Sequence, residues 1–397
     1  MDISKRFTEL RQFLQKHQYL CDLEALSRYP LENHPYLSWS ESIAKLSEEQ
    51  KHQLENTYSP ELVQEQSYKE FLIELNQLMH LPQEKFDEQT IDPILGRKIK
   101  AKKRHEIQII RTQLHDKPIK HFIDIGSGAG HLSSLLLLNN KKCSTCIDMS
   151  AENQLIGKKK LKNDFPDILN RIEFKNQVIE KDFECDHSSD SALLGLHACG
   201  DLSVHLVQKF IHSDFSWLLS YGCCYHKLSA DAVNLSQAAK KSPLKLTNHA
   251  LTMATKSYKP ISQKEYNFRK RVKHFRYSLH MLLKDQLQEE FTAVGSADAS
   301  DYQGEFSNYC YKYKPELKQF FTQKQLENFL ISKENQNSLS QLLDFGIIRS
   351  HMARLIELYI ILDRALLLQE HGHKVDIKET FSKDISPRNI SLMAERI

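Results

Sequence analysis

The sequence has 397 residues, which is enough for two or three domains with a hydrophobic core. Its formal net charge of +3 is small, which excludes a strong overall field for nucleic acid and leaves room only for a local basic surface. Eight cysteines without regular spacing favour a reducing compartment over a disulfide-rich secreted scaffold.

The apolar segments of the chain indicate a soluble protein of cytoplasmic type. Residues 1–6 lack the apolar region of a signal peptide. The longest apolar run, residues 135–138, is far too short to span a bilayer. Export without a cleaved signal remains open.

Residues 1–100 are expected to form an N-terminal helical domain. Ser47 and Gln50 fit a capping box, and apolar residues between 62 and 79 recur at helical spacing. No motif in this region carries chemistry. The region is therefore either a cap on the catalytic domain or a docking surface for the substrate.

A basic run occupies residues 97–106 and leads toward the first predicted strand. Such a run is usually the solvated face of a helix. Alternatively, it borders a ligand cleft, where Lys102, Lys103 or His105 could meet a carboxylate or a phosphate.

A glycine-rich turn follows the first predicted strand. The apolar run at residues 122–125 indicates a buried parallel strand, and the apolar stripe at 132–138 indicates a helix. Between them stand Gly126, Gly128 and Gly130. Glycines let the backbone approach a ligand closely, and a helix N-terminus offers free amide groups. The stretch therefore predicts a nucleotide-binding turn.

Two acidic residues favour S-adenosylmethionine (SAM) over a dinucleotide at this turn. The turn lacks the G-x-G-x-x-G spacing of dinucleotide sites. Asp124 precedes the first glycine, where it would repel a pyrophosphate but suits the cationic amino group of SAM. Asp148 stands at the end of the next predicted strand, where a ribose would offer its two hydroxyls. A glycine turn without a ligand is the alternative.

Strand and helix patterns alternate beyond the turn. Strands are expected at residues 143–147, 172–178, 192–196 and 217–221, with a basic helix at 151–163. This alternation predicts an α/β fold with a doubly wound, Rossmann-like parallel sheet. Ligands of such sheets bind outside the carboxyl ends of the strands, so Asp182, after the third strand, would lie near the SAM adenine.

The residues expected at the cofactor site combine the turn, the strand ends and the basic run. They are Lys103, Asp124, Gly126, Ser127, Gly128, Gly130, Leu132, Asp148, Asp182 and His197.

Histidine and cysteine gather after the fourth and fifth strands, in His197-Ala-Cys-Gly-Asp201 and Gly222-Cys-Cys-Tyr-His-Lys227. A cysteine could attack a pyrimidine ring, or His197 and Asp201 could remove a proton from an acceptor. The cluster could also bind zinc through His197, Cys199, Cys223, Cys224 and His226. Small cysteines that only pack beside the cofactor are the alternative. The catalytic candidates are His197, Cys199, Asp201, Cys223, Cys224 and Tyr225, and no metal is expected.

Basic and aromatic residues are interleaved within residues 256–283. RNA is recognised through phosphate contacts and base stacking, which this mixture would supply. An amphipathic helix with a solvated basic face explains the same pattern.

The last part of the chain is expected to return to the sheet. Leu355, Leu358 and Leu362 share one face of a helix expected over 351–369, and residues 381–393 end in strand-like alternation. The expected organisation is a SAM-binding core at 101–230, a large helical insertion at 231–375, and a C-terminal strand within 376–397.

Several strings of this sequence resemble a family of methyltransferase-like proteins, those related to methyltransferase-like protein twenty-five and to the ribosomal RNA adenine dimethylase domain-containing protein. The strings are Lys102-Lys-Arg-His-Glu-Ile107, Asp124-Ile-Gly-Ser-Gly-Ala-Gly-His-Leu132, Leu196-His-Ala-Cys-Gly-Asp-Leu202, Gly222-Cys-Cys-Tyr225 with Lys227-Leu228, Leu362-Asp-Arg364, Leu368-Gln-Glu370 and Ser386-Pro-Arg-Asn389. They span roughly residues 100–393.

The resemblance implies a class I SAM-dependent methyltransferase, with a more distant likeness to a tRNA 2'-O-methyltransferase that has similar His/Cys loops. His226 stands where the family pattern implies methionine. Enzymes that methylate the exocyclic amine of adenine place Asn/Asp-Pro-Pro-aromatic after the fourth strand. This chain has neither proline at residues 197–201, so methylation of that amine is disfavoured.

From these patterns we expect a SAM-dependent methyltransferase that acts on a macromolecule by direct methyl transfer. RNA, either tRNA or rRNA, is the first choice of substrate, and a protein side chain is the second. A non-catalytic scaffold that keeps the SAM-binding fold is the alternative from another class. No membrane partner is expected, and the sequence does not indicate an oligomeric state.

Overall fold

The computed structural model describes residues 2–83, 99–255 and 260–397. The start of the basic run at residues 97–98, and residues 256–259 of the basic-aromatic segment, lie outside the described residues. Two compact units make up the chain. Unit 1 comprises Met1–Lys16, Leu78–Lys259 and Ala353–Ile397, and unit 2 comprises His17–Gln77 and Pro260–Met352.

This division differs from the domain boundaries expected from the sequence. Most of the N-terminal helical region joins residues 260–352 in unit 2, and much of the expected insertion lies with the sheet. The reason is packing between distant segments. Lys51 and Asp344, whose side chains are 9% and 3% exposed, form an ion pair at 2.6 Å inside unit 2.

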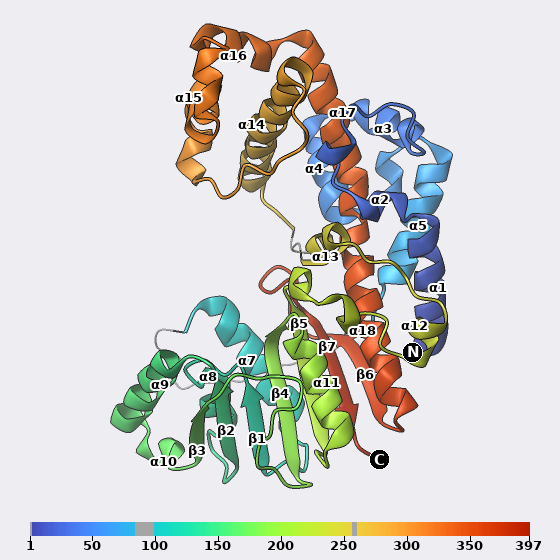
Figure 1. Ribbon diagram of the computed structural model, residues 1–397. Helices are drawn as coiled ribbons and strands as arrows, with labels where there is room; N and C mark the ends of the chain where they lie inside the picture. Colours follow the sequence, from blue (N-terminus) through green and yellow to red (C-terminus); the bar gives the residue numbers. More distant parts are fainter. Residues whose placement is uncertain (1, 84–98, 256–259) are drawn as a thin grey trace. The chain divides into compact units, whose positions relative to one another are not determined.

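Unit 1 is built around a seven-stranded sheet (Figure 1). Its strands are β1 (His121–Ile125), β2 (Cys143–Asp148), β3 (Ile172–Asn176), β4 (Ser191–Cys199), β5 (Trp217–Cys223), β6 (Lys374–Glu379) and β7 (Ile390–Glu395). The spatial order is β3-β2-β1-β4-β5-β7-β6, with β1 to β5 mutually parallel and β7 antiparallel to both neighbours. This sheet confirms the predicted fold class.

The strand order places a topological switch point between β1 and β4. The chain runs from β1 outward to β3 and then crosses back to β4, which pairs with β1 from His121↔Ser191 to Asp124↔Leu194. Ligands of open α/β sheets bind in the crevice at the carboxyl ends of the two strands at such a point. The glycine turn follows β1, and His197 lies near the carboxyl end of β4.

Helices cover both faces of the sheet (Figure 1). On one face, Ile107 of α7 (Ala101–Leu114) and Leu135 of α8 (His131–Leu136) join Phe122 in one core cluster. On the other face lie α11 (Leu202–His212) and α18 (Met352–Glu370), which are joined by a hydrogen bond from Arg364 to Ser203 at 3.1 Å. Near-continuous burial along β4 is typical of a strand covered on both sides.

The C-terminal segment contributes two strands where one was expected. β6 and β7 pair antiparallel from Lys374↔Glu395 to Glu379↔Ile390. Charged residues alternate with Val375 and Ile377 in β6, a pattern typical of an edge strand that resists pairing with other chains. Because of these charged residues, the sequence did not predict a strand here.

The remaining helices of unit 1 are α1 (Ile3–Lys16), α9 (Ala151–Asp164), α10 (Pro166–Leu169), α12 (Gln237–Lys241) and α13 (Asn248–Thr255). Two short 3-10 helices, η3 (Tyr225–Lys227) and η4 (Ala230–Ala232), follow β5.

Unit 2 is helical. Its helices are α2 (Tyr19–Asp22), α3 (Leu37–Ala44), α4 (Glu48–Thr57), α5 (Gln66–Met79), α14 (Gln263–Leu287), α15 (Phe306–Tyr313), α16 (Gln323–Ile331) and α17 (Lys333–Ser350), with 3-10 helices η1 (Leu26–Arg28), η2 (Pro60–Leu62), η5 (Ala299–Tyr302) and η6 (Pro315–Gln319). The predicted capping box of Ser47 and Gln50 is present at the start of α4. Within the described residues, no helix has the length and apolar character needed to cross a bilayer.

Candidate active site

The glycine turn after β1 leaves room for a ligand. Gly126, Gly128 and Gly130 all have positive φ, at 70°, 57° and 69°. A Cβ added at Gly128 would meet no described atom within 4 Å, so the backbone there is open to a bound molecule. The Ser127 hydroxyl is buried and has no oxygen or nitrogen partner among the described residues. The turn therefore combines open space with a buried hydroxyl that has only the Cys146 sulfur as a partner.

Asp148, at the end of β2, holds this turn in place. Its Oδ2 accepts a hydrogen bond from the Gly128 amide at 2.7 Å, and its Oδ1 accepts one from the Ser150 amide at 2.8 Å. Each carboxylate oxygen can accept a further hydrogen bond. Asp148 therefore shapes the turn and keeps capacity to bind a ligand hydroxyl.

Asp124 is buried beneath α8, with 2% of its surface exposed. Its Oδ2 accepts a hydrogen bond from the Ser133 hydroxyl at 3.0 Å. Burial raises the pKa of Asp124 to about 6, although Ser133 and the charge of Lys103 act in the opposite direction. A bound cation would stabilise the ionised carboxylate and offset its burial.

Lys103 is the residue of the basic run that is electrostatically coupled to the turn. Its charge acts on Asp124 and on His131, whose pKa falls to about 4 because burial, and then Lys103, disfavour the imidazolium. His105, from the same run, is buried and accepts a hydrogen bond from the Ser382 amide at 3.2 Å. The structure thus brings Lys103 close to Asp124 and ties His105 to the β6–β7 loop.

His197 lies at an irregularity in β4. The register between β4 and β5 shifts between Leu196 and Ala198, and His197 has φ of 63°. A bulge of this kind breaks the side-chain alternation of a strand and re-aims one side chain, often beside an active site. This backbone frees the imidazole from the regular pattern at the carboxyl end of β4.

Glu106 of α7 is the carboxylate partner of His197. His197 Nε2 lies 3.1 Å from Glu106 Oε2, and the Ser386 hydroxyl donates to Glu106 Oε1 at 2.6 Å. Glu106 is fully buried. Burial raises its pKa, but His197, Ser386 and the charge of Lys102 together lower it by more, so the net pKa lies below the ordinary value.

Sequence reasoning missed Glu106 and Ser386 as functional residues. It named Asp201 with His197 as groups that could remove a proton from an acceptor, and that role of Asp201 stays a prediction. Asp201 Oδ1 accepts the Ser229 amide at 2.8 Å and so anchors the loop after η3. Glu106 lies inside the basic run. The one signal in the sequence was that an acidic residue stands alone among cations.

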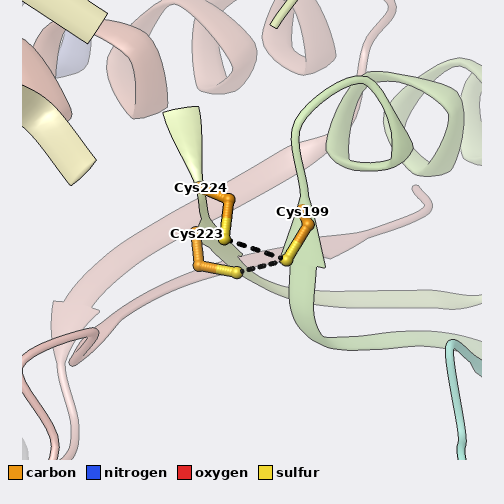
Figure 2. A group of neighbouring side chains, drawn as sticks. All are labelled: Cys199, Cys223 and Cys224. Atoms are coloured by element: carbon orange, nitrogen blue, oxygen red, sulfur yellow. Dashed lines mark hydrogen bonds between the residues drawn. The ribbon is translucent and has the colours of Figure 1, made fainter. Parts of the chain in front are cut away.

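Three cysteines meet at the carboxyl ends of β4 and β5 (Figure 2). Cys199 Sγ lies 2.8 Å from Cys223 Sγ and 3.3 Å from Cys224 Sγ. Hydrogen bonds from Cys223 and Cys224 lower the pKa of Cys199 to about 6. The pKa of Cys223 is raised, chiefly because its proton is held in the hydrogen bond to Cys199.

Tyr225, one of the catalytic candidates, is buried, and a catalytic role for it stays a prediction. The side chain is 1% exposed, and its hydroxyl donates to Glu357 at 3.3 Å. Arg388 lies over the ring at 5.7 Å. His226, the next residue of this loop, has Nδ1 3.1 Å from the Thr255 hydroxyl. Both residues fasten the loop after β5.

Two further residues assigned to the cofactor site take different positions. Leu132 is 3% exposed and belongs to the core cluster beneath the sheet face. Asp182 is exposed in the irregular segment after β3. A direct cofactor contact through either side chain stays a prediction.

The basic and aromatic residues of α14 separate onto two faces. Tyr266 and Phe275 are buried, whereas Lys264, Arg269 and Arg271 are exposed. Buried rings cannot stack on RNA bases, so these two aromatics fit the amphipathic-helix explanation, whereas Phe268 is 38% exposed. Arg269 pairs with Glu265 at 2.6 Å, and Arg271 donates to the backbone carbonyls of Tyr302 and Gly304, so both of these cations already have partners.

Residues 101–231 match a protein family described as a methyltransferase domain. The chain carries a SAM-dependent methyltransferase domain. The match includes α7, the glycine turn, and the ends of β4 and β5. The matched segment thus includes the switch point of the sheet.

Solved structures of similar shape are distant. The YjhP protein of E. coli is 14% identical, over 57% of this chain and 94% of that chain, with a TM-score of 0.26. The MccD protein is 12% identical, over 73% and 94%, with a TM-score of 0.26. A geranyl diphosphate methyltransferase bound to GPP and sinefungin is 12% identical, with a TM-score of 0.25, and the match covers 38% of this chain and 61% of that chain, less than two thirds of its length. Likenesses this weak say nothing about the substrate.

Proposed function

We propose that this methyltransferase transfers the methyl group of SAM to a hydroxyl group of RNA, with His197 as the general base. The contact between His197 and Glu106 carries the proposal. Glu106 accepts the hydrogen of Nε2, which leaves the lone pair of the imidazole on Nδ1. Among the described residues, no hydrogen bond occupies Nδ1. The imidazole is therefore oriented as a proton acceptor.

A hydroxyl acceptor needs such a base. SAM supplies a methyl group that its sulfonium already activates, so the protein has to position the acceptor and remove its proton. The hydroxyl oxygen attacks the methyl carbon as the carbon–sulfur bond breaks, and the proton passes to Nδ1 of His197. Glu106 and Ser386 are positioning residues, because they hold the imidazole without touching the acceptor.

The cofactor is placed by the turn and its acids. In this proposal Asp124 faces the methionine amino group, Lys103 meets the methionine carboxylate, and Asp148 binds the ribose hydroxyls. The open backbone at Gly128 and the buried Ser127 hydroxyl support this placement.

RNA is the acceptor that combines hydroxyl groups with phosphates. Its ribose 2'-hydroxyl suits the His197 base, and exposed Lys264 of α14 suits its phosphates. The resemblance to the methyltransferase-like family, and more distantly to a tRNA 2'-O-methyltransferase, points the same way. A protein side chain is the second candidate, since a serine or threonine also offers a hydroxyl.

The test uses tritium-labelled SAM with the full chain and a cell extract. The product is divided into nuclease-treated and protease-treated halves, and the labelled RNA is then hydrolysed in alkali. A 2'-O-methyl group blocks alkaline cleavage, so the label should appear in alkali-stable dinucleotides.

Other outcomes would overturn parts of the proposal. Label in alkali-released mononucleotides would mean base methylation, and label removed by protease would mean a protein acceptor. Label no greater than that of Asp124→Ala would favour the non-catalytic scaffold.

A further inference from the structure

Three thiols point toward one another where β4 and β5 end (Figure 2). Cys199 and Cys223 are direct partners in the register of the two strands. The three sulfur atoms, including that of Cys224, all lie within 4.8 Å of one another. All three cysteines are free, since the shortest distance of 2.8 Å far exceeds a disulfide bond. Three soft donor atoms therefore face one point.

The backbone of Cys224 is strained in a way that gathers these thiols. Successive side chains of a strand point to opposite faces, so Cys223 and Cys224 would diverge in a regular strand. Cys224 instead has φ of 50° and ψ of 46°, in the left-handed region. That conformation is disfavoured for any residue with a Cβ atom. Strain of this kind persists at functional sites when the surrounding structure enforces it.

The nearby histidines are engaged elsewhere. His197 bonds Glu106, and Nδ1 of His226 lies beside the Thr255 hydroxyl. The His197 carbonyl lies 3.4 Å from Cys223 Sγ as a hydrogen-bond acceptor. Of the five ligands considered from the sequence, the described structure gathers the three sulfurs.

We propose that Cys199, Cys223 and Cys224 bind a zinc ion, whose fourth coordination position is open to water or another exogenous donor. Thiolates are preferred zinc ligands, and a site with three protein ligands is the usual open form. Zn–S bonds of about 2.3 Å in a tetrahedron place sulfurs about 3.8 Å apart, so binding moves these sulfurs apart by up to about 1 Å. Cys199 and Cys224 are partly exposed, which gives the ion access from solvent.

The sequence offered zinc as one explanation of this cluster, although no metal was expected. It is also independent of the proposed RNA substrate, because the sulfurs form the site whatever the acceptor is. Its test therefore reads out metal and not methyl transfer.

The first measurement is the metal content of the full chain. The protein is produced with zinc in the medium and purified with a reductant and without a metal-affinity column. Elemental mass spectrometry should find about one zinc per chain. After removal of zinc by a chelator, Co²⁺ should produce the ligand-field and thiolate charge-transfer bands of tetrahedral cobalt.

Four variants separate ligation from folding. Cys199→Ser and Cys223→Ser should weaken zinc binding at least about tenfold. Cys224→Gly should do the same while relieving the left-handed strain, so it should remain folded. Cys143→Ser, which changes an exposed cysteine of β2 in the same sheet, should retain the metal. SAM binding by calorimetry reports folding in every case.

Two results would overturn the site. One is wild-type protein with background zinc and no cobalt bands after full reduction. The other is a Cys199→Ser variant that folds and keeps its zinc.

Discussion

Asp124 makes cofactor binding sensitive to pH at the scale of one residue. Its raised pKa of about 6 means that the carboxyl is neutral below that pH and cannot pair with the SAM amino group. We expect the SAM dissociation constant to rise roughly tenfold between pH 7.5 and pH 5. Calorimetry across this range checks the slope. Asp124→Asn should bind weakly with little pH dependence, and an equal slope in both proteins would contradict the placement.

The same residue predicts how the stability of the cofactor-free protein depends on pH. Because the pKa of Asp124 is raised on folding, its contribution favours the folded state at low pH and is lost as pH rises through about 6. Asp124→Asn removes the ionisable carboxyl, so the variant does not lose this stability as pH rises. The variant should gain stability relative to wild type, on the order of 2–3 kcal/mol between pH 4 and pH 8. Urea unfolding measures the difference in the free energy of unfolding between the variant and wild type. A difference that does not grow with pH would show that the pKa of the carboxyl is not raised.

Glu106 sets the tautomer of His197. In Glu106→Gln the amide can donate to Nε2, which would move the ring proton to Nδ1 and remove the base. We expect kcat to fall about 10²- to 10⁴-fold with little change in SAM affinity. Single-turnover rates on the labelled RNA check this.

Ser386→Ala is the matched control for that experiment. It removes one hydrogen bond to Glu106 and leaves the carboxylate in place, so the loss should be about fivefold. A Glu106→Gln rate within this smaller range would show that His197 acts without its carboxylate partner.

At the scale of elements, α9 packs closely against the glycine turn. A Cβ at Gly157 of α9 would lie 2.3 Å from the Ala129 carbonyl oxygen in the turn. Gly157→Ala should therefore displace the turn, costing about 1–3 kcal/mol of stability and weakening SAM binding. Thermal unfolding and calorimetry measure both effects.

Gly346 of α17 provides a control for the change from glycine to alanine. An added Cβ there meets no described atom within 4 Å. Gly346→Ala should be neutral or stabilising by about 0.5–1 kcal/mol, because alanine suits a helix better. Equal behaviour of the two variants would contradict the close approach at Gly157.

Elements with local signals were predictable from the sequence. The helix expected at 151–163 is α9 at Ala151–Asp164, and the glycine turn follows β1 as expected. These elements depend on periodicity and on glycine chemistry within a few residues. β6 was missed because its charges obscured the strand pattern.

The contacts that define the site depend on tertiary packing. Glu106 and His197 are 91 positions apart, and their contact needs both the packing of α7 on the sheet and the bulge in β4. The sulfur contact of Cys199 and Cys223 needs the register of two strands. Tyr225 is held by a hydrogen bond to Glu357 of α18 and lies under Arg388 of the β6–β7 loop. No local pattern reveals these partners.

At the scale of the whole molecule, each unit has its own buried ionic contacts. In unit 1, fully buried Arg354 bonds Glu357 at 2.8 Å, Glu379 at 2.6 Å and Asn389 at 2.7 Å. In unit 2, the contact is the Lys51–Asp344 pair. Removing one partner of a buried pair costs about 3–5 kcal/mol, because the other charge is left uncompensated.

We therefore expect two calorimetric unfolding transitions that respond to different changes. Arg354→Met should lower the transition of unit 1, and Lys51→Met should lower that of unit 2. SAM at a hundredfold excess over its dissociation constant should stabilise only the unit 1 transition, by about 2.7 kcal/mol. A single transition shifted by all three changes would show that the units unfold together.

The place of β7 in the sheet has a consequence for synthesis on the ribosome. β7 lies between β5 and β6, yet the second segment of unit 2 is translated between β5 and β7. At about 5–20 residues per second, β7 is synthesised roughly ten to thirty seconds after β5. The edge of β5 stays unpaired during that time. During that interval the nascent chain exposes an apolar strand edge that other chains can pair with. Pairing of β7 with β5 then closes this exposed edge.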